Sequence, residues 1–496
     1  MRLGRGPALS SKWRTQALWT SCGGAFLSRS RQVEPFFESI RKENELRPSN
    51  ISNVNVSRIF FGLVVLGVGG AAWWSEQIVR VPTTPGRIEI TYWEKWTGFE
   101  GEGIRSVVDK FNAEQDRIFV KLLVVSQVDQ KTMLSTAGGV PPDIAGLWGS
   151  NVAQYADDGL LMPLDELIAE YGIRGDDYIP VYWDIGKYRG KMYALPSTPA
   201  TTALHYNTKF LEEVGRGPND YPKTIEELTE LGDRLVVRDR LGRIARAGFL
   251  PAEPGWWNWS WGYFFGGQLW DGDRKITSDS PENVRAFEWV QSFTKKYGPT
   301  ELQVFRSGFG NFSSPQNAFM SQKVGMVLQG VWMYNFISQF EPNLPWAAAP
   351  FPHPEDRPDL ANMTIAEMDI LCIPRGARHP REAFEFIAWV QKQENMEMLC
   401  LSHRKNSPLK NVSDEFWASH PNPYIKLFHE LAQSPNAITV PKTPVFAEYQ
   451  RELNNAFDLI NLNRVTPKRA LADVRIRMQP KLEQWARRNE MREARQ

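Results

Sequence analysis

The sequence predicts an α/β fold arranged in two lobes. Segments with strand character alternate with amphipathic helical segments, a pattern typical of strand–helix–strand units and parallel sheets. The chain has 496 residues, which exceeds one ordinary domain and favours two lobes with extensions. Hydrophobic residues make up 42% and charged residues 23% of the chain, the balance of a folded globular protein.

The first strand–helix–strand unit follows a linker at residues 76–87 that is rich in Pro and Gly near its end. Residues 88–93 have strand character, and residues 104–111 place apolar side chains at the i, i+3, i+4 and i+7 positions of a helix. Residues 118–125 form the next strand. This unit predicts a parallel pair of strands with a right-handed crossover.

The alternation continues to the end of the chain. Thr224 and Glu227 form a capping box at the start of one helix, and Pro281 takes the favoured first position of another. The further strands are expected at 143–148, 192–195, 203–206 and 324–328, and the further helices at 153–158, 161–171, 224–237, 281–297, 383–388 and 467–485.

One strongly apolar run, IFFGLVVLGVGGAAWW at 59–74, precedes the globular pattern. As a helix it would span about 24 Å, short of the roughly 30 Å hydrocarbon core, which suits a signal sequence or short membrane anchor at 58–75. Basic residues upstream predict that residues 1–57, a cytoplasmic or disordered extension, stay inside and that the rest is exported to the periplasmic or extracellular face. Cleavage and retention as an anchor both fit this run.

Composition and motifs narrow the function classes. The net charge is +1, so no global field attracts nucleic acid. The sequence contains no GxSxG, no P-loop and no HExxH motif, and it predicts no catalytic residue, cofactor or metal site. Its cysteines are Cys22, Cys372 and Cys400; their spacing argues against zinc, and a Cys372–Cys400 bond is left open.

Six segments in order resemble the carbohydrate-type (family 1) extracellular solute-binding proteins of ABC importers. They include ITYWEKWTGFEGEGIRSVVDKFNAEQ, AGGVPPDIAGLWGSNVAQYADDGLLMPLDEL and GKMYALPSTPATTALHYNTKFLEEVG. The six segments are 90–115, 137–167, 190–215, 222–228, 319–332 and 373–390. The resemblance covers about 88–490. Two features depart from the family pattern: the usual lipid-attachment cysteine is missing directly after the apolar run, and residues 365–368 replace a frequent Gly pair.

The resemblance implies a periplasmic-binding-protein-like (type II) fold, with a hinge between the lobes and an N-terminal apolar helix before them. The hinge is expected near 197–203 and 346–350. The expected boundaries are 88–200 for the first lobe, 201–346 for the second, 347–377 for a return to the first, and 378–496 for the rest of the second with its C-terminal helix.

The resemblance also implies that a ligand binds between the lobes, where loops follow the carboxyl ends of strands. Sugars offer C–H faces to aromatic rings and hydroxyls to planar polar groups, although core packing explains many tryptophans equally well. The candidate ligand-binding residues are Trp93, Glu94, Trp96, Trp148, Asn151, Trp256, Trp257, Trp259, Trp332, Glu367, Arg404 and Asn406.

The predicted function is therefore non-enzymatic capture of a sugar-like solute, a mono- or oligosaccharide, by a monomer that delivers it to ABC permease subunits in the membrane. No nucleic-acid partner is expected. Two alternatives fit the same residues. One is a secreted carbohydrate-active enzyme, because glycosidase carboxylates need no local motif. The other is a membrane-anchored sugar sensor that signals through residues 1–57.

Overall fold

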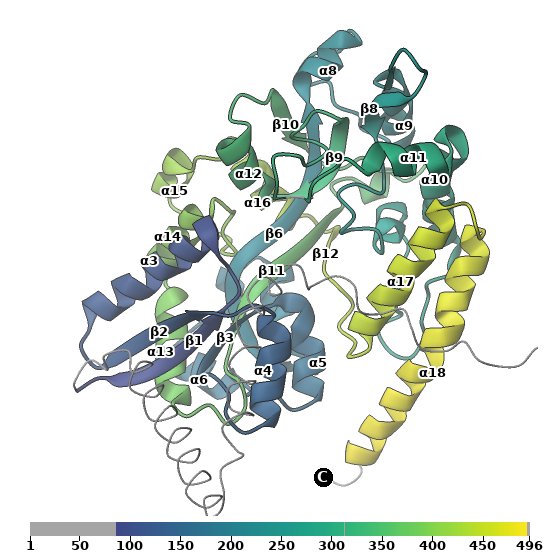
Figure 1. The fold of residues 1–496 in the computed structure, drawn as a ribbon. Coiled ribbons are helices and arrows are strands. Elements are labelled where there is room, and N and C mark those ends of the chain that lie inside the picture. The colour runs from purple at the N-terminus through teal and green to yellow at the C-terminus, as the bar shows by residue number, and fades with distance from the viewer. Residues whose placement is uncertain (1–85, 312, 494–496) are drawn as a thin grey trace, which may run out of the picture. The chain divides into compact units, whose positions relative to one another are not determined.

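The computed structural model describes residues 86–493 except position 312, and these residues form an α/β fold around a mixed sheet (Figure 1). The strands are β1 (Ile88–Glu94), β2 (Ile118–Val124), β3 (Ile144–Trp148), β4 (Lys187–Tyr188), β5 (Lys191–Met192), β6 (Ala194–Asn207), β7 (Val237–Arg238), β8 (Ile244–Phe249), β9 (Val324–Gly330), β10 (Trp346–Ala349), β11 (Thr364–Cys372) and β12 (Ala437–Ile438). Ten strands form one sheet in the order β2-β1-β3-β11-β6-β9-β8-β7, with β10 beside β6 and β12 beside β11.

The first lobe contains β2, β1, β3, β11 and the first half of β6. Strands β1 and β2 are parallel, with Ile88 opposite Ile118, which confirms the crossover predicted from the sequence. The helices of this lobe are α3 (Gly98–Glu114), α4 (Val128–Ala137), η2 (Gly149–Asn151), α5 (Val152–Asp157), α6 (Asp165–Glu170), η3 (Gly175–Asp177), α7 (Pro180–Ile185), α13 (Pro380–Val390), α14 (Gln393–His403) and α15 (Asp414–Ser419).

The second lobe contains the second half of β6 together with β9, β8, β7 and β10. Its helices are α8 (Thr208–Glu213), α9 (Ile225–Arg234), η4 (Trp261–Phe265), α10 (Pro281–Tyr297), α11 (Pro299–Arg306), α12 (Met333–Phe340), η5 (Pro358–Leu360), α17 (Phe446–Asn461) and α18 (Pro467–Glu493). Helix α16 (Ile425–Ala432) packs against β6. The side chain of Thr224 caps α9 by accepting from the Glu227 N–H at 3.1 Å, as the capping box predicts.

Strand β6 is the long connection between the two halves of the sheet (Figure 1). Two separate strands were expected at 192–195 and 203–206, with a hinge near 197–203 between them. Instead, that stretch pairs with β11, with Thr201 opposite Ala366 and Ala200 opposite Glu367. Further along β6, Thr202 lies opposite Gly330 of β9. Strand β6 therefore runs through the hinge expected near 197–203, whereas the hinge segment expected near 346–350 is β10, which pairs with the second half of β6.

Two expected lobe boundaries need correction. Strand β10 pairs with β6 from Leu204 to Asn207, within the second lobe, so the return to the first lobe begins with β11 and not at residue 347. Residues 378–496 were expected in the second lobe. Helices α13 and α14 of this segment instead pack with the first lobe. Phe386 of α13 contacts Tyr92 and Phe111, with ring centroids 5.9 and 5.1 Å away. The apolar face of α13 therefore completes the core of the first lobe.

The expected extension at 1–57 and apolar segment at 58–75 lie outside the described residues. Within the described part of the chain, no helix combines the length and apolar character needed to span a bilayer. Cys372 and Cys400 are both free thiols, and both are buried. Burial raises the pKa of the Cys372 thiol to about 12, so this side chain packs as a small neutral residue.

Candidate functional site

The predicted first-lobe residues gather where β1 and β3 end beside β11. Strand β1 ends at Glu94 and β3 ends at Trp148, and Asp369 of β11 pairs with Trp148. The ends of these strands therefore place Glu94, Trp96 and Trp148 around one point of the sheet. Gly146 makes room for this arrangement, since a side-chain methyl there would overlap the Glu94 carboxylate.

Lys95 lies between the side chains that gather at these strand ends. Its ammonium nitrogen is 3.2 Å from Glu94 Oε1 and 3.2 Å from Asp369 Oδ1. It also lies 5.0 Å from the ring centroid of Trp96 and 5.2 Å from that of Trp148, within the range of cation–π attraction. The Lys95 side chain is only 5% exposed, so its ammonium group is stabilised by the two carboxylates and the two rings and hardly by water.

A second buried ammonium, Lys405, approaches from the loop after α14. Its nitrogen is 3.1 Å from Glu100 Oε1 and 3.5 Å from Asp369 Oδ2, and it lies 4.9 Å from the centroid of Trp96. Asp369 Oδ2 also accepts hydrogen bonds from Trp96 Nε1 at 3.1 Å and Thr198 Oγ1 at 2.8 Å. We call Glu94, Lys95, Glu100, Asp369 and Lys405 the buried charge cluster.

Ion pairing within the buried charge cluster lowers the pKa of Asp369 and raises the pKa of Lys95 and Lys405. Burial by itself raises the pKa of Asp369, but Lys95 and Lys405 outweigh that effect and hold the pKa below its usual range. Burial by itself lowers the pKa of each lysine, whereas the carboxylates raise both above their usual range. Asp369, Lys95 and Lys405 are therefore all charged throughout the neutral pH range.

Glu367, another predicted residue, lies two positions before Asp369 on β11. Burial, followed by the charge of Asp369, raises the pKa of the Glu367 carboxyl to about 7. The Glu367 charge in turn acts on Tyr263 of η4, whose pKa is raised mainly by burial. No hydrogen bond or ion pair joins the Glu367 carboxyl to another side chain within the described part of the chain.

Three predicted tryptophans form a cluster in the second lobe. The ring centroid of Trp332 lies 5.4 Å from that of Trp256 and 6.3 Å from that of Trp257. The Trp332 ring folds back over Gly330, where any side chain would collide with it. The buried indole N–H groups of Trp257 and Trp332 have no acceptor among the described residues. We call Trp256, Trp257 and Trp332 the tryptophan cluster.

The remaining predicted residues are more scattered. Trp259 is 1% exposed and packs edge-on against Phe446 at 5.3 Å between centroids, which places it in the core. Asn406 is fully buried and donates to Tyr182 OH at 3.2 Å. Asn151 accepts from the backbone N–H of Trp148 at 3.2 Å. Trp93 lies within β1 and packs against the larger core.

Arg404 connects the two lobes. Its guanidinium lies 4.2 Å from the ring centroid of Phe99 on α3, in the first lobe, and 5.7 Å from that of Tyr334 on α12, in the second. It also donates to Ser338 Oγ at 2.5 Å. A cavity of about 530 Å³ lies beside it, lined by the start of α3 and by α12.

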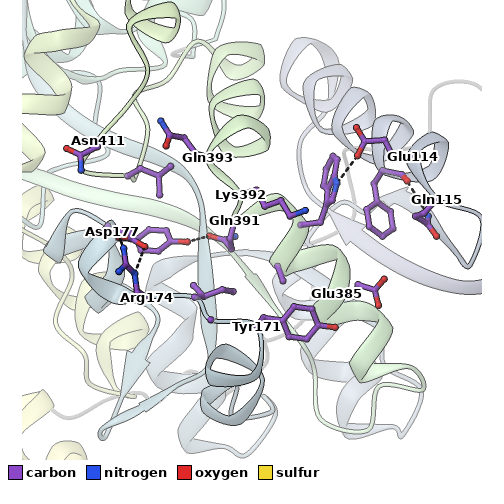
Figure 2. A pocket seen from close by; sticks show the side chains of 17 residues that line it. Glu114, Gln115, Tyr171, Arg174, Asp177, Glu385, Gln391, Lys392, Gln393 and Asn411 are labelled. Atoms are coloured by element: carbon purple, nitrogen blue, oxygen red, sulfur yellow. Dashed lines mark hydrogen bonds and ion pairs between the residues drawn. The ribbon is translucent and has the colours of Figure 1, made fainter.

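A larger cavity lies elsewhere in the first lobe. It measures about 820 Å³, and Figure 2 shows Glu114 and Gln115 on one side of it and Arg174 and Asp177 on the other. Gln391 links its wall to the crossing strand, because Gln391 Nε2 donates to Pro196 O at 2.9 Å. None of the predicted ligand-binding residues lines this cavity. In the described part of the chain, no group of His, Cys, Asp and Glu is arranged to hold a metal ion.

Sequence reasoning missed Lys95, Asp369, Lys405 and Thr198. Lys95 had a local signal, because it stands between two candidates in the stretch WEKW. A lysine in a loop is nevertheless expected to be solvated. Lys405 had the same signal, because it stands between the candidates Arg404 and Asn406. Asp369 and Thr198 had no such signal, since they meet only through pairing of the distant strands β11 and β6.

The match to known families covers more than half of the chain. Residues 99–397 match the family described as bacterial extracellular solute-binding protein. The chain belongs to this family. Members of this family are binding proteins that act outside the cytoplasm, so the extracellular or periplasmic side is the location of this solute-binding protein.

Individual relatives match over most of their own length. The solute-binding protein is 20% identical to the maltotriose-binding protein of Pyrococcus abyssi over 75% of this chain and 77% of that protein. It is 22% identical to an ABC transporter extracellular-binding protein of Pyrococcus horikoshii, over 71% and 80% of the two chains. The solved structure of CpMnBP1 with mannotriose bound is 25% identical, with a TM-score of 0.70 over 78% of this chain and 99% of that one.

Proposed function

We propose that the solute-binding protein captures an oligosaccharide between its two lobes and delivers it to an ABC importer. The observation that carries this proposal is the pair of aromatic surfaces, one on each side of the crossing strands. Trp96 and Trp148 border the buried charge cluster in the first lobe, and the tryptophan cluster lies in the second. The relatives that bind maltotriose and mannotriose support the same class of ligand.

The two surfaces supply complementary contacts for a sugar. Aromatic rings stack on the apolar C–H faces of pyranose rings. Trp257 is 8% exposed, and its buried indole N–H lacks an acceptor among the described residues, so a ligand hydroxyl oxygen would remove the cost of leaving it unpaired. Glu367 and Asn151 provide planar polar groups of the kind that sugar hydroxyls need.

Closure of the lobes is part of this proposal. A ligand that contacts both lobes binds the closed state more tightly and shifts the population towards it. The hinge is proposed where β6 and β11 cross between the halves of the sheet, with Arg404 holding α3 and α12 together when the lobes are closed. Permease subunits would then recognise the closed monomer, retained at the membrane by the segment at 58–75 or released after cleavage.

Calorimetric titration with mannobiose and maltotriose tests the proposal. We expect saturable binding without hydrolysis of either sugar. Trp332→Ala should weaken binding about tenfold or more, since an aromatic platform contributes about 1–2 kcal/mol. Trp270→Ala is the matched control, because Trp270 is partly buried in the same lobe beside α18.

Two outcomes would contradict the proposal. One is an absence of binding across a panel of neutral oligosaccharides by a protein that remains folded. The other is turnover of an oligosaccharide, which would favour the carbohydrate-active enzyme.

A further inference from the structure

The buried charge cluster contains more acidic than basic groups. Glu94, Glu100 and Asp369 share the two ammonium groups of Lys95 and Lys405. Asp369 Oδ2 is contacted by Thr198, Trp96 and Lys405, and Asp369 Oδ1 is contacted by Lys95. Each of the two lysines is therefore already paired with two carboxylates of the protein.

Glu367 adds a further negative charge without a counter-ion of its own. It lies on the same strand as Asp369 and within the influence of its charge. The neighbouring groups that titrate are Asp369 on β11 and Tyr263 on η4, and neither brings a positive charge. The Glu367 side chain is partly exposed, and its ionised carboxylate would be stabilised by a cation that pairs with it.

The neighbourhood of Glu367 has the composition of an ammonium site. Ala200 of β6 pairs with Glu367, and Thr202 of the same strand pairs with Gly330, over which the Trp332 ring folds. Glu367 and the tryptophan cluster therefore flank the same stretch of β6, and Tyr263 lies close by. A carboxylate next to aromatic rings stabilises a cation by ion pairing and by cation–π attraction together.

We propose that the saccharide bound by this protein carries a protonated amine, and that the Glu367 carboxylate is the counter-ion that selects it. This inference rests on the proposed function, because it requires a saccharide between the lobes. It adds a substrate class, the amino sugars, and a specificity-determining residue. A neutral sugar could hydrogen-bond to Glu367 through a hydroxyl, but it would bring no positive charge to balance the ionised carboxylate.

The test compares the glucosamine disaccharide from chitosan with its N-acetylated counterpart, which has the same skeleton without the charge. We expect the wild-type protein to bind the amine form about tenfold more tightly, a difference of about 1.4 kcal/mol. Glu367→Gln should remove that preference. Glu355→Gln, which changes an exposed glutamate, should retain it.

A pH series on the wild-type protein tests the same point without a variant. Affinity for the amine form should rise as Glu367 ionises and fall again as the sugar ammonium loses its proton, which gives a maximum in the pH profile, while affinity for the acetylated form should show no such maximum. The proposal is overturned if the acetylated form binds as tightly as the amine form, or if Glu367→Gln keeps the preference. If the protein binds mannobiose or maltotriose but not the amine form, the amino-sugar proposal is overturned and the proposed function stands. If it binds no saccharide, the amino-sugar proposal and the proposed function are both overturned.

Discussion

Asp369 is the residue on which two buried ammonium groups converge. Its carboxylate lies 3.2 Å from Lys95 and 3.5 Å from Lys405 and accepts hydrogen bonds from Trp96 and Thr198. Removing one partner of a buried ion pair leaves the other charge uncompensated, which costs far more than the loss of a surface pair. Much of the stability of this region therefore depends on one carboxylate.

Asp369→Asn should lower the free energy of unfolding by about 3–5 kcal/mol, because two buried lysines lose their shared counter-charge. Urea denaturation at neutral pH measures the change. Asp356→Asn is the matched control, since Asp356 is exposed and pairs with Arg285 at 2.8 Å, and it should cost at most about 1 kcal/mol. Equal losses for the two variants would contradict the role of the buried cluster.

Glu367 should make the ligand-free protein less stable as pH rises. Its pKa in the folded protein is about 7, above the ordinary value of 4.5. Below both values the carboxyl is neutral in both states and costs nothing; between them, folding increasingly opposes ionisation. Wild type should therefore lose about 1–2 kcal/mol relative to Glu367→Gln between pH 5 and pH 8. A constant difference across that range would contradict the assignment.

At the residue scale, local sequence predicted part of the site. Trp96 and Trp148 could be found because they directly follow strands that alternation reveals, and the structure brings both to Lys95. Trp259 had the same appearance in sequence as its neighbours Trp256 and Trp257, yet it lies in the core. Neighbouring positions in an irregular Gly-rich stretch have no fixed periodicity, so their directions cannot be assigned from spacing.

The junction of β9 and α12 is an element whose geometry depends on one small residue. The Trp332 ring occupies the space that a side chain at Gly330 would need. Gly330→Ala should displace the ring and weaken saccharide binding about tenfold, while costing less in stability than loss of a core residue. Titration calorimetry measures the affinity. Gly308→Ala is the control, because nothing lies within contact of a methyl group there; unchanged binding by Gly330→Ala would contradict the role of the cluster.

At the scale of elements, the sequence predicted units that are stabilised locally. The strand–helix–strand unit of β1, α3 and β2 and the capped helices α9 and α10 form from neighbouring residues. The continuity of β6 was not predicted, because Pro196 and Pro199 cannot donate to a ladder and are uncommon within strands. Pairing with β11, which is distant in sequence, supplies the interactions that hold this stretch extended.

At the scale of the whole molecule, the two crossing strands should make the lobes unfold together. We expect one calorimetric transition for residues 86–493, because separating either lobe would break the shared pairs of β6 and β11. A saccharide at 100 times its dissociation constant should add about 2.7 kcal/mol to the free energy of unfolding. Two resolved transitions, only one of them shifted by the ligand, would contradict this coupling.

The order of β11 in the sheet also constrains how the chain is made. The first lobe is completed by β11 between β3 and β6, and by α13 and α14 on its outer face. Its sheet therefore lacks an inner strand until residue 372 has left the ribosome, and its core lacks a layer until residue 403 has followed. A nascent chain halted after the second-lobe strand β9 would expose unpaired edges. Most of the polypeptide must accordingly be synthesised before the first lobe can complete its sheet and its core, although that lobe contains the first strand of the chain.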